Sequence, residues 1–401
     1  MKKDFFFAGG LVLLPLLFSV SGCSTAPQND DVIETYFFLR DAIDGDALSA
    51  FAHQAIIDAK NAPGYTLAVI KGETVIYNNF EGTVSFTPGV LHNDQFFLNH
   101  NTSERYVHNS TFPLASSTKF IVAALIFKMI EDGLINDLND PVKNYVSEMY
   151  YDDVTIYHCL THSTGLDFEK ATTKPEHVSN GRFNPEWLDD VYTSQLPKLF
   201  ASGTQSQYSA SYAILLDLLS RISGKSADQY ANEVMFNPCR MEDTYFNWEN
   251  VDQSRVLMKN DYNKNTGVDH LFFGSTRVDS SGNGGLFSTI NDMANFASMM
   301  LNDGMFKGTQ VLTKETIDKL AEPVPSWGRA IGAFQKHNGG SLFPASAGYH
   351  AFGHPGSNGD GIVIDRENNL AYVIMINNGS NTNGYRLLAN VFNEIYGLLK
   401  E

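Results

Sequence analysis

The sequence predicts an α+β fold: an antiparallel sheet built from N- and C-terminal strands and flanked by helices, with a mostly helical subdomain inserted between them. Three observations support this fold class. β-rich runs lie near both ends of the 401-residue chain, helical periodicities fill its middle, and 43% of the residues are hydrophobic, which is enough for a large core. A cleft between the sheet and the inserted part is then the expected place for a functional site.

The first 22 residues have the pattern of a signal peptide. After a short basic start, the apolar run Phe5–Val20 is shorter than the ~20 residues that a membrane-spanning helix needs. It ends in Val-Ser-Gly-Cys at 20–23, which resembles a bacterial lipobox. We therefore expect Cys23 to be lipidated and residues 23–45 to form a polar tether. The alternative is an ordinary secretory signal with an unrelated cysteine.

This segment also predicts a location. Lipidation at Cys23 would make the protein an exported lipoprotein, on the periplasmic side of the outer membrane in a Gram-negative host and on the outer face of the cell membrane otherwise. In an oxidising compartment, Cys159 and Cys239 could pair or remain two separate buried thiols. The net charge of −17 argues against nucleic acid as a partner, because an acidic surface repels phosphates.

The folded domain is expected to cover residues 46–401. A helix-like stretch over 46–60 precedes two short β-rich runs, 65–70 and 74–77, whose spacing is that of a hairpin. The next strong element is a helix over 116–132. It is apolar on more than one face, so we expect it to be buried.

Residues 134–290 are expected to form the inserted, mostly helical subdomain. It contains a helix that ends at Gly224, and a capping box of Ser226 and Gln229 that opens the next helix. A further helical rhythm runs over 288–301. The remaining elements are two strands and a final helix, at 361–365, 371–376 and 387–396.

Ser116-Ser-Thr-Lys119 is the most informative local motif. Three residues apart on a helix, Ser116 and Lys119 lie on one face, one turn apart. A serine hydroxyl becomes a nucleophile when a base takes its proton, and a lysine can be that base if burial lowers its pKa. The alternative is a helix-capping serine beside a surface lysine.

Two further segments favour the catalytic interpretation. Tyr208 stands just before a helix start, and its phenol could serve as a second base or a proton relay. His354, Gly356 and Ser357 stand just before the strand at 361–365. A glycine-rich strand edge of this kind can offer a backbone N–H to a developing oxyanion.

With these motifs in this order, the sequence resembles the serine β-lactamase and penicillin-binding-protein superfamily, on its class C, DD-carboxypeptidase and esterase side. The likeness covers about residues 46–400 and includes scaffold stretches at 62–70, 154–166 and 284–292. It implies an exported serine hydrolase that cleaves an ester or amide, either a peptidoglycan-type D-amino-acid peptide or a small acyl ester, through an acyl-enzyme. It implies no cofactor and no metal.

The resemblance also assigns roles to the three catalytic candidates. Ser116 is the nucleophile, and Lys119 shares or takes its proton. Tyr208 is the partner base that protonates the leaving group. The substrate would be a small molecule or a cell-wall peptide, and the membrane would be reached through the lipid anchor.

The strand edge has implied roles too. The N–H groups of Ser116 and Ser357 form the oxyanion hole, and Gly356 leaves room for the substrate along the strand. His354 stands where the family often has Lys, which weakens the case for a carboxylate-bearing substrate, because a histidine is only partly charged near neutral pH. The family's second motif usually ends in an Asn that holds the lysine and the substrate's carbonyl. Here that place is Ala210, so efficient β-lactam hydrolysis is in doubt.

Two other interpretations stay open at this point. One is a catalytically weak or inactive penicillin-binding-like lipoprotein that binds cell-wall peptide, which Ala210 favours. The other is zinc at His158 and His162, four residues apart on a helix, although the glutamate of a His-Glu-x-x-His site is missing.

Overall fold

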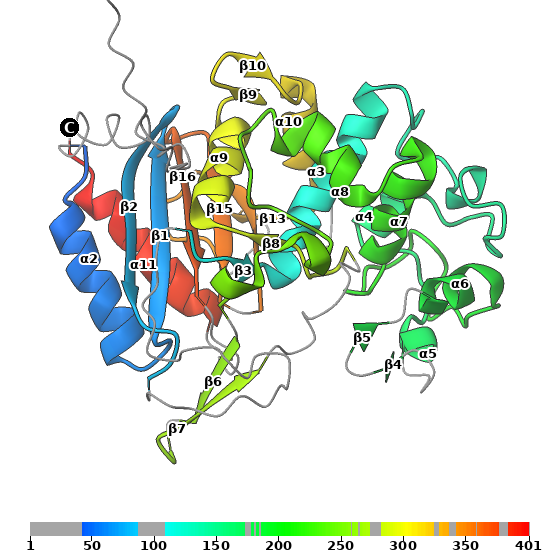
Figure 1. Cartoon of the computed structure of the whole chain (residues 1–401). Helices are drawn as coiled ribbons and strands as arrows, with labels where there is room; N and C mark the ends of the chain where they lie inside the picture. Colours follow the sequence, from blue (N-terminus) through cyan, green and yellow to red (C-terminus); the bar gives the residue numbers. More distant parts are fainter. Residues whose placement is uncertain are drawn as a thin grey trace, which may run out of the picture.

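A computed structural model describes residues 42–400 apart from 87–108, 173–177, 180–181, 184–185, 258, 264, 273–281, 325–328, 337–341, 358 and 377–383. The expected signal peptide, the lipidation site at Cys23 and nearly all of the tether lie outside the described residues. Figure 1 shows a central sheet, helices on both of its faces, and a group of helices to one side. This is the α+β architecture that the sequence predicts.

Strands from both ends of the chain share one sheet. Within the described residues it has eight strands in the order β11-β12-β13-β14-β15-β16-β1-β2, and all neighbours are antiparallel. The N-terminal β1 (Gly64–Lys71) pairs with the C-terminal β16 (Leu370–Met375), with Leu67 opposite Ile374. The other strands are β2 (Thr74–Gly82), β11 (Pro323–Val324), β12 (Arg329–Ala330), β13 (Ala333–Gln335), β14 (Phe352–Pro355) and β15 (Gly361–Asp365).

Two apolar layers cover the two faces of this sheet, because successive residues of a strand point to opposite sides. On β1, Leu67 and Val69 belong to the layer that contains α2 and α11. Ala68 and Ile70 belong to the layer that contains α3 and α9. These four helices are α2 (Gly45–His53), α3 (Thr118–Glu131), α9 (Ile290–Leu301) and α11 (Gly384–Leu398).

α3 is buried on all its sides, as its sequence predicts. Every residue from Thr118 to Phe127 is buried, Lys119 among them. A helix that is apolar all round is stable only when it is enclosed, and α3 contacts the sheet on one side and α7 and α10 on others. The turn η3 (Ala115–Ser117) precedes α3 directly, so the burial of this helix fixes the position of the Ser116 motif.

Helices and loops from the middle of the chain gather beside α3 (Figure 1). The predicted stop at Gly224, with φ +67°, and the capping box of Ser226 and Gln229 are both confirmed. No described helix is long and apolar enough to cross a membrane. The helices of this region and the short α10 are α4 (Ile156–Leu160), α5 (Glu169–Thr172), α6 (Glu186–Thr193), α7 (Tyr212–Ser223), α8 (Ala227–Ala231) and α10 (Lys314–Leu320).

The middle region also contains short strands that the sequence analysis did not predict. β6 (Lys259–Asn263) and β7 (Val268–Phe272) form a hairpin, and their mixed polar residues hide the alternation that marks a strand. β3 (Phe112–Pro113) pairs with β8 (Phe287–Ser288), which brings two distant parts of the chain together. The remaining pairs are β4 (Val178–Ser179) with β5 (Arg182–Phe183), and β9 (Met305–Phe306) with β10 (Thr309–Gln310).

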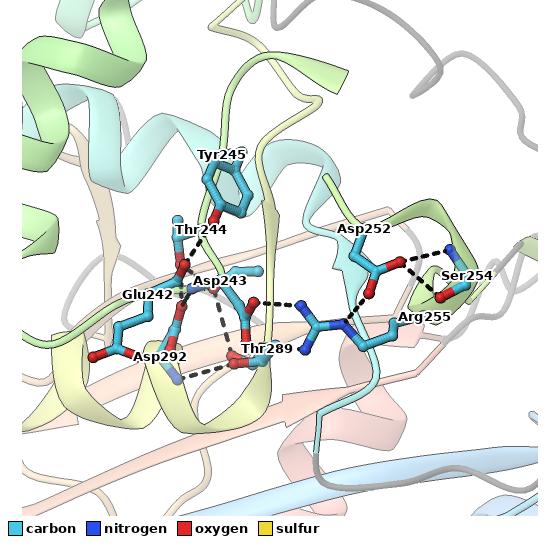
Figure 2. A network of polar contacts seen from close by, with 10 residues as sticks. Glu242, Asp243, Thr244, Tyr245, Asp252, Ser254, Arg255, Thr289 and Asp292 are labelled. Atoms are coloured by element: carbon cyan, nitrogen blue, oxygen red, sulfur yellow. Dashed lines mark hydrogen bonds and ion pairs between the residues drawn. The ribbon is translucent and has the colours of Figure 1, made fainter. Parts of the chain in front are cut away.

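A polar network fastens a loop of the middle region to the start of α9 (Figure 2). Asp292 accepts hydrogen bonds from the Asp243 N–H at 2.8 Å and from the Thr244 hydroxyl at 2.7 Å. Arg255 in turn forms an ion pair with Asp243. Thr289 caps α9 by accepting the Asp292 N–H at 3.3 Å. The network therefore anchors the chain that follows β8.

The two cysteines do not form a disulfide. Cys159 and Cys239 are both buried free thiols. Burial raises the pKa of both thiols, that of Cys239 to about 12, so neither is a reactive thiolate near neutral pH.

Candidate active site

Ser116 lies in the strained turn η3, at the start of α3. Ala115, directly before it, has φ +42°, a left-handed conformation that costs a non-glycine residue ~1–2 kcal/mol. The segment before β8 packs across this turn: the Leu114 N–H donates to the Leu286 carbonyl at 2.8 Å. Gly284 lies against the same turn, since a Cβ there would be in van der Waals contact with the Ala115 carbonyl at 3.4 Å. The segment before β8 thus holds the turn that carries Ser116 in place.

Lys119 is only 1% exposed and points its amine at Ser116. Its Nζ donates to the Ser116 Oγ at 3.3 Å and also to the backbone carbonyl of Asn283. The amine lies 4.7 Å from the centre of the Tyr208 ring and 5.9 Å from that of Tyr212. The interpretation as a surface lysine is therefore wrong. An amine in contact with a hydroxyl inside the protein is the arrangement that proton transfer from a serine requires.

Tyr208 reaches the same serine from the loop before α7. Its Oη donates to the Ser116 Oγ at 2.7 Å. The ring stacks on His162, with 4.5 Å between the ring centres. His162 also holds the loop itself: its carbonyl accepts the Gln207 N–H at 2.9 Å, and its Nδ1 accepts the Ser209 N–H at 3.2 Å. His162 therefore contacts the Tyr208 ring and also holds the loop that carries it.

The two histidines of the zinc interpretation have structural contacts. His158 lies in the capping box of α4, where its Nδ1 accepts the Thr155 N–H at 3.2 Å. His162 has the contacts to the Tyr208 loop described above. Across the described residues, no cluster of three or more His, Cys, Asp or Glu side chains could hold a metal ion.

The edge of β14 lies beside the turn η3. The Ser117 Oγ donates to the His354 carbonyl at 3.2 Å, which joins the strand to the turn. The His354 ring is buried, its Nδ1 donates to the Pro355 carbonyl at 2.8 Å, and it packs edge-on against Phe334. Ser357 follows in the loop after β14 and is exposed. The backbone of this strand thus contacts the chain next to the nucleophile.

The loop after β14 is built over a buried carboxyl group. A Cβ on Gly356 would stand 2.2 Å from the Asp360 Oδ1, so a larger residue here would force this buried carboxyl group to move. Asp360 is 3% exposed, and burial raises its pKa to about 7. The Gly356 N–H donates to the Asp360 carbonyl at 2.8 Å, which closes this loop.

A cleft of about 560 Å³ opens at Ser116. Its lining includes Lys119, Tyr208, Ala210 and Asn283. Larger apolar residues of the middle region also line it: Leu166, Phe168, Leu199 and Phe200. Two acidic residues, Asp167 and Glu169, are part of the lining as well. The structure thus brings Ser116, Lys119 and Tyr208 into one cleft, whereas His354, Gly356 and Ser357 do not line it.

A second cleft, of about 750 Å³, lies beside α10. Charged side chains dominate its lining, and several are joined in ion pairs, such as Arg366 with Asp318 at 2.6 Å. No serine or cysteine is among its described lining residues. The cleft at Ser116 is therefore the candidate active site.

Comparison with known proteins agrees with this geometry. Residues 53–391 match the family model described as Beta-lactamase. The chain belongs to the beta-lactamase family. This membership confirms the resemblance that the motifs indicated, and with it the fold class. The protein thus belongs to a family of serine hydrolases that includes amidases and carboxypeptidases.

Individual relatives in the beta-lactamase family are distant. The chain is 24% identical over 302 residues to the N-acetylmuramyl-L-alanine amidase of Bacillus subtilis (strain 168). The aligned part makes up 66% of this chain and 67% of that protein. It is 24% identical over 355 residues to the "Putative D-alanyl-D-alanine carboxypeptidase" of Escherichia coli O157:H7, covering 79% of this chain and 78% of that one.

Solved structures support the fold. The structure of "EstCE1, a hydrolase with promiscuous acyltransferase activity" matches with a TM-score of 0.67 at 16% identity, over 87% of this chain and 99% of that one. At this identity the likeness is one of fold.

Two residues of the site were missed by the sequence analysis. His162 was weighed as a metal ligand or as scaffold, and Asn283 was not singled out. Asn283 directly precedes a stretch at 284–292 that resembles the family scaffold, but its role depends on contacts that no local pattern contains. Its carbonyl lies 164 positions from Lys119 in the sequence.

Proposed function

We propose that this protein is a serine hydrolase that cleaves an ester or an amide through an acyl-enzyme on Ser116. One observation supports this above all: the Ser116 Oγ is in hydrogen-bonding contact with the Lys119 amine at 3.3 Å and with the Tyr208 hydroxyl at 2.7 Å. A serine placed between an amine and a phenol has both a base for its own proton and an acid for the leaving group.

In the proposed acylation step, the Ser116 Oγ bonds to the carbonyl carbon while the neutral Lys119 amine takes the hydroxyl proton. The negative charge on the carbonyl oxygen is stabilised by the N–H groups of Ser116 and Ser357. The leaving alcohol or amine takes the Tyr208 proton, and Tyr208 recovers one from Lys119. Water then attacks the ester by the reverse proton path and releases the acid.

The cleft favours an apolar acyl group on the substrate. Leu166, Phe168, Leu199 and Phe200 offer apolar surface beside the nucleophile. Lys119 is the only lysine or arginine among the described residues that line the cleft, and it is already bonded to Ser116 and Asn283. A small acyl ester therefore fits better than a substrate with a terminal carboxylate.

A cell-wall peptide is the second candidate substrate. The names of two relatives, the amidase of Bacillus subtilis and the carboxypeptidase of Escherichia coli, favour it.

We also propose that Cys23 is lipidated and that the protein is an exported lipoprotein. Mass spectrometry of the N-terminal peptide, with Cys23→Ala as the control, tests this: an unmodified Cys23 in the mature wild-type protein would rule out the anchor.

Labelling the tether-trimmed protein with a tagged fluorophosphonate and with a fluorescent penicillin tests the catalytic proposal. We expect fluorophosphonate labelling of the wild type and none of Ser116→Ala. Absence of labelling of the wild type by both probes would instead support a non-catalytic binding protein. A panel of acyl esters, D-amino-acid amides and β-lactams then identifies the substrate class, with the neutral acyl esters expected to turn over fastest.

A further inference from the structure

Asp360 places a carboxyl group inside the protein, close to the proposed active site. The residue is only 3% exposed, and neither of its carboxyl oxygens has a hydrogen-bond partner of ordinary geometry. Leaving a buried polar group without a partner is destabilising, and such groups are rare in folded proteins. The carboxyl group of Asp360 is therefore more consistent with a role in function than with one in stability.

The side chain of Asp360 lies directly against the loop that follows β14. The Gly356 N–H donates to the Asp360 carbonyl at 2.8 Å, and the Gly359 N–H donates to the Gly356 carbonyl at 3.1 Å. A Cβ on Gly356 would stand 2.2 and 2.3 Å from the two carboxyl oxygens. Ser357, whose N–H stabilises the oxyanion in the proposed mechanism, is the next residue. A shift of the carboxyl group would therefore move this N–H as well.

Ser117 connects the carboxyl group to the turn η3. Burial raises the pKa of Asp360 to about 7, and the Ser117 hydroxyl is close enough to lower it in part, although their contact is looser than an ordinary hydrogen bond. The same hydroxyl donates its proton to the His354 carbonyl at 3.2 Å. A hydroxyl has only one proton to donate. While Ser117 donates to His354, it can bond to the carboxyl group only as an acceptor, which requires the protonated carboxyl.

We propose that Asp360, in its protonated form, is a positioning residue that joins the loop after β14 to the turn η3 through the Ser117 hydroxyl. The inference rests on the proposed acyl-enzyme function and deepens it. The neutral carboxyl donates to Ser117, and Ser117 donates to the His354 carbonyl. The two N–H groups that receive the oxyanion in the proposed mechanism, those of Ser116 and Ser357, are then held on the two sides of one chain of hydrogen bonds.

Ionisation of Asp360 would reverse this arrangement. A carboxylate only accepts hydrogen bonds, so it would compete with the His354 carbonyl for the proton of Ser117. Once that proton turns to the carboxylate, the contact between β14 and the turn η3 is lost. The distance between the two oxyanion donors is then no longer fixed, and turnover should fall.

The groups around Asp360 leave this carboxyl group as the one that titrates. The neighbouring β14 and α3 carry two titratable side chains, His354 and Lys119, and neither acts on the pKa of Asp360. The α11 helix and the residue after β16 contribute the apolar Leu388 and Ile376, which pack against the loop. No charged side chain of the described residues therefore offsets a negative charge at Asp360.

Steady-state kinetics on p-nitrophenyl butyrate from pH 6 to 9 tests the proposal in three variants. Asp360→Asn keeps the shape of the side chain and a donor for Ser117, but it cannot ionise. Asp360→Leu keeps a similar shape without a donor. Ser117→Ala removes the middle of the hydrogen-bonded chain, so it tests the same contact if Asp360→Leu fails to fold.

Asp292→Asn is the matched control. Asp292 is also buried, and burial raises its pKa to about 7 as well. Its side chain bonds to Asp243 and Thr244 at the start of α9, not to the turn η3 or the loop after β14. Asp292→Asn should therefore keep the wild-type pH profile of kcat/KM, even where it changes stability.

We expect Asp360→Asn to match the wild type within ~3-fold at pH 6, and its kcat/KM relative to the wild type to rise ~10-fold or more by pH 9, because only the wild-type carboxyl ionises. Asp360→Leu and Ser117→Ala should each lose kcat by ~10-fold at pH 6 with a smaller change in KM, since both misplace the oxyanion donors. Combining these two should add no further loss, because both remove one contact.

The proposal is overturned if the ratio of Asp360→Asn to wild type stays constant from pH 6 to 9, or if Asp292→Asn changes the profile equally. It is also overturned if Ser117→Ala, shown by circular dichroism to be folded, keeps kcat within twofold of the wild type. A wild type with no Ser116-dependent turnover would overturn the proposed function itself, which is a separate result.

Discussion

The Tyr208 hydroxyl and the Ser116 hydroxyl meet at 2.7 Å although 92 positions separate the two residues in the sequence. One belongs to the loop before α7 and the other to the turn before α3. This contact joins the middle region to the helix that is buried against the sheet. Reactivity at Ser116 therefore depends on how these two parts are held together.

Removing this hydroxyl alone should be costly. Tyr208→Phe keeps the stacking on His162 but loses the proton donor, so we expect kcat on acyl esters to fall by ~10²–10⁴-fold. Tyr212→Phe is the control, because its hydroxyl donates to the Leu160 carbonyl at 3.0 Å instead. Equal activity of the two variants in a steady-state assay would contradict a catalytic role for Tyr208.

Lys119 should be indispensable for acylation. Both Lys119→Ala and the longer, uncharged Lys119→Met remove the base one turn from Ser116, so labelling by fluorophosphonate should become undetectable on the time scale of the wild type. Lys128→Ala, on the same helix, removes an amine that pairs with Asp132 at the surface and should label normally. Stopped-flow or gel-based labelling rates distinguish the cases, and an unchanged rate in Lys119→Met would refute the role.

Restoring the family's amide should change substrate preference. Ala210→Asn adds a side chain in the lining of the cleft that can bond to a substrate's amide carbonyl, so we expect nitrocefin turnover to rise. Nitrocefin hydrolysis by the variant and the wild type, measured side by side with ester turnover, gives the answer. A flat nitrocefin rate would show that residue 210 does not limit β-lactam hydrolysis.

Stability should depend on pH through the buried carboxyl of Asp360. Burial raises its folded-state pKa to about 7 from an ordinary value of 3.8, so the folded protein holds a proton that the unfolded chain releases. The resulting stabilisation is complete below about pH 4 and is lost as pH rises through about 7, an effect on the order of a few kcal/mol.

Asp360→Asn, which cannot ionise, should remove this part of the pH dependence. Urea unfolding at pH 5, 6, 7 and 8 would show a difference from the wild type that changes between pH 5 and 7 and levels off by pH 8. Burial also raises the pKa of Asp292 to about 7. Asp292→Asn should therefore reduce the pH dependence of the free energy of unfolding in the same way. A difference between Asp360→Asn and the wild type that is the same at every pH would contradict the assignment.

The long, strongly patterned elements could be predicted from the sequence. The helix over 116–132 was expected to be buried because it is apolar on more than one face, and the pairing of N- and C-terminal strands followed from β-rich runs at both ends. Strands such as β11 and β12, with two residues each, are too short to show a period of two. They exist because the neighbouring strand offers backbone partners, which is a tertiary effect.

The candidate site also has residues that the sequence predicts and residues that it does not. Ser116 in the turn η3 and Lys119 in the first turn of α3 are three positions apart on a continuous helical stretch, so their proximity follows from local geometry. Tyr208 could be included because its motif resembles that of a known superfamily. Asn283 and His162 act through backbone carbonyls and ring stacking across long stretches of chain, and such contacts leave no residue pattern to find.

The two ends of the described chain are bonded to each other. The Asp44 N–H donates to the Leu398 carbonyl and the Lys400 N–H to the Ala42 carbonyl, each at 2.9 Å. Both ends belong to the α2 and α11 layer, across the sheet from α3 and its serine. A short linker between residues 400 and 42 would therefore circularise the domain without disturbing the cleft, and new ends could be opened at the tip of the β6–β7 hairpin to give a permuted enzyme.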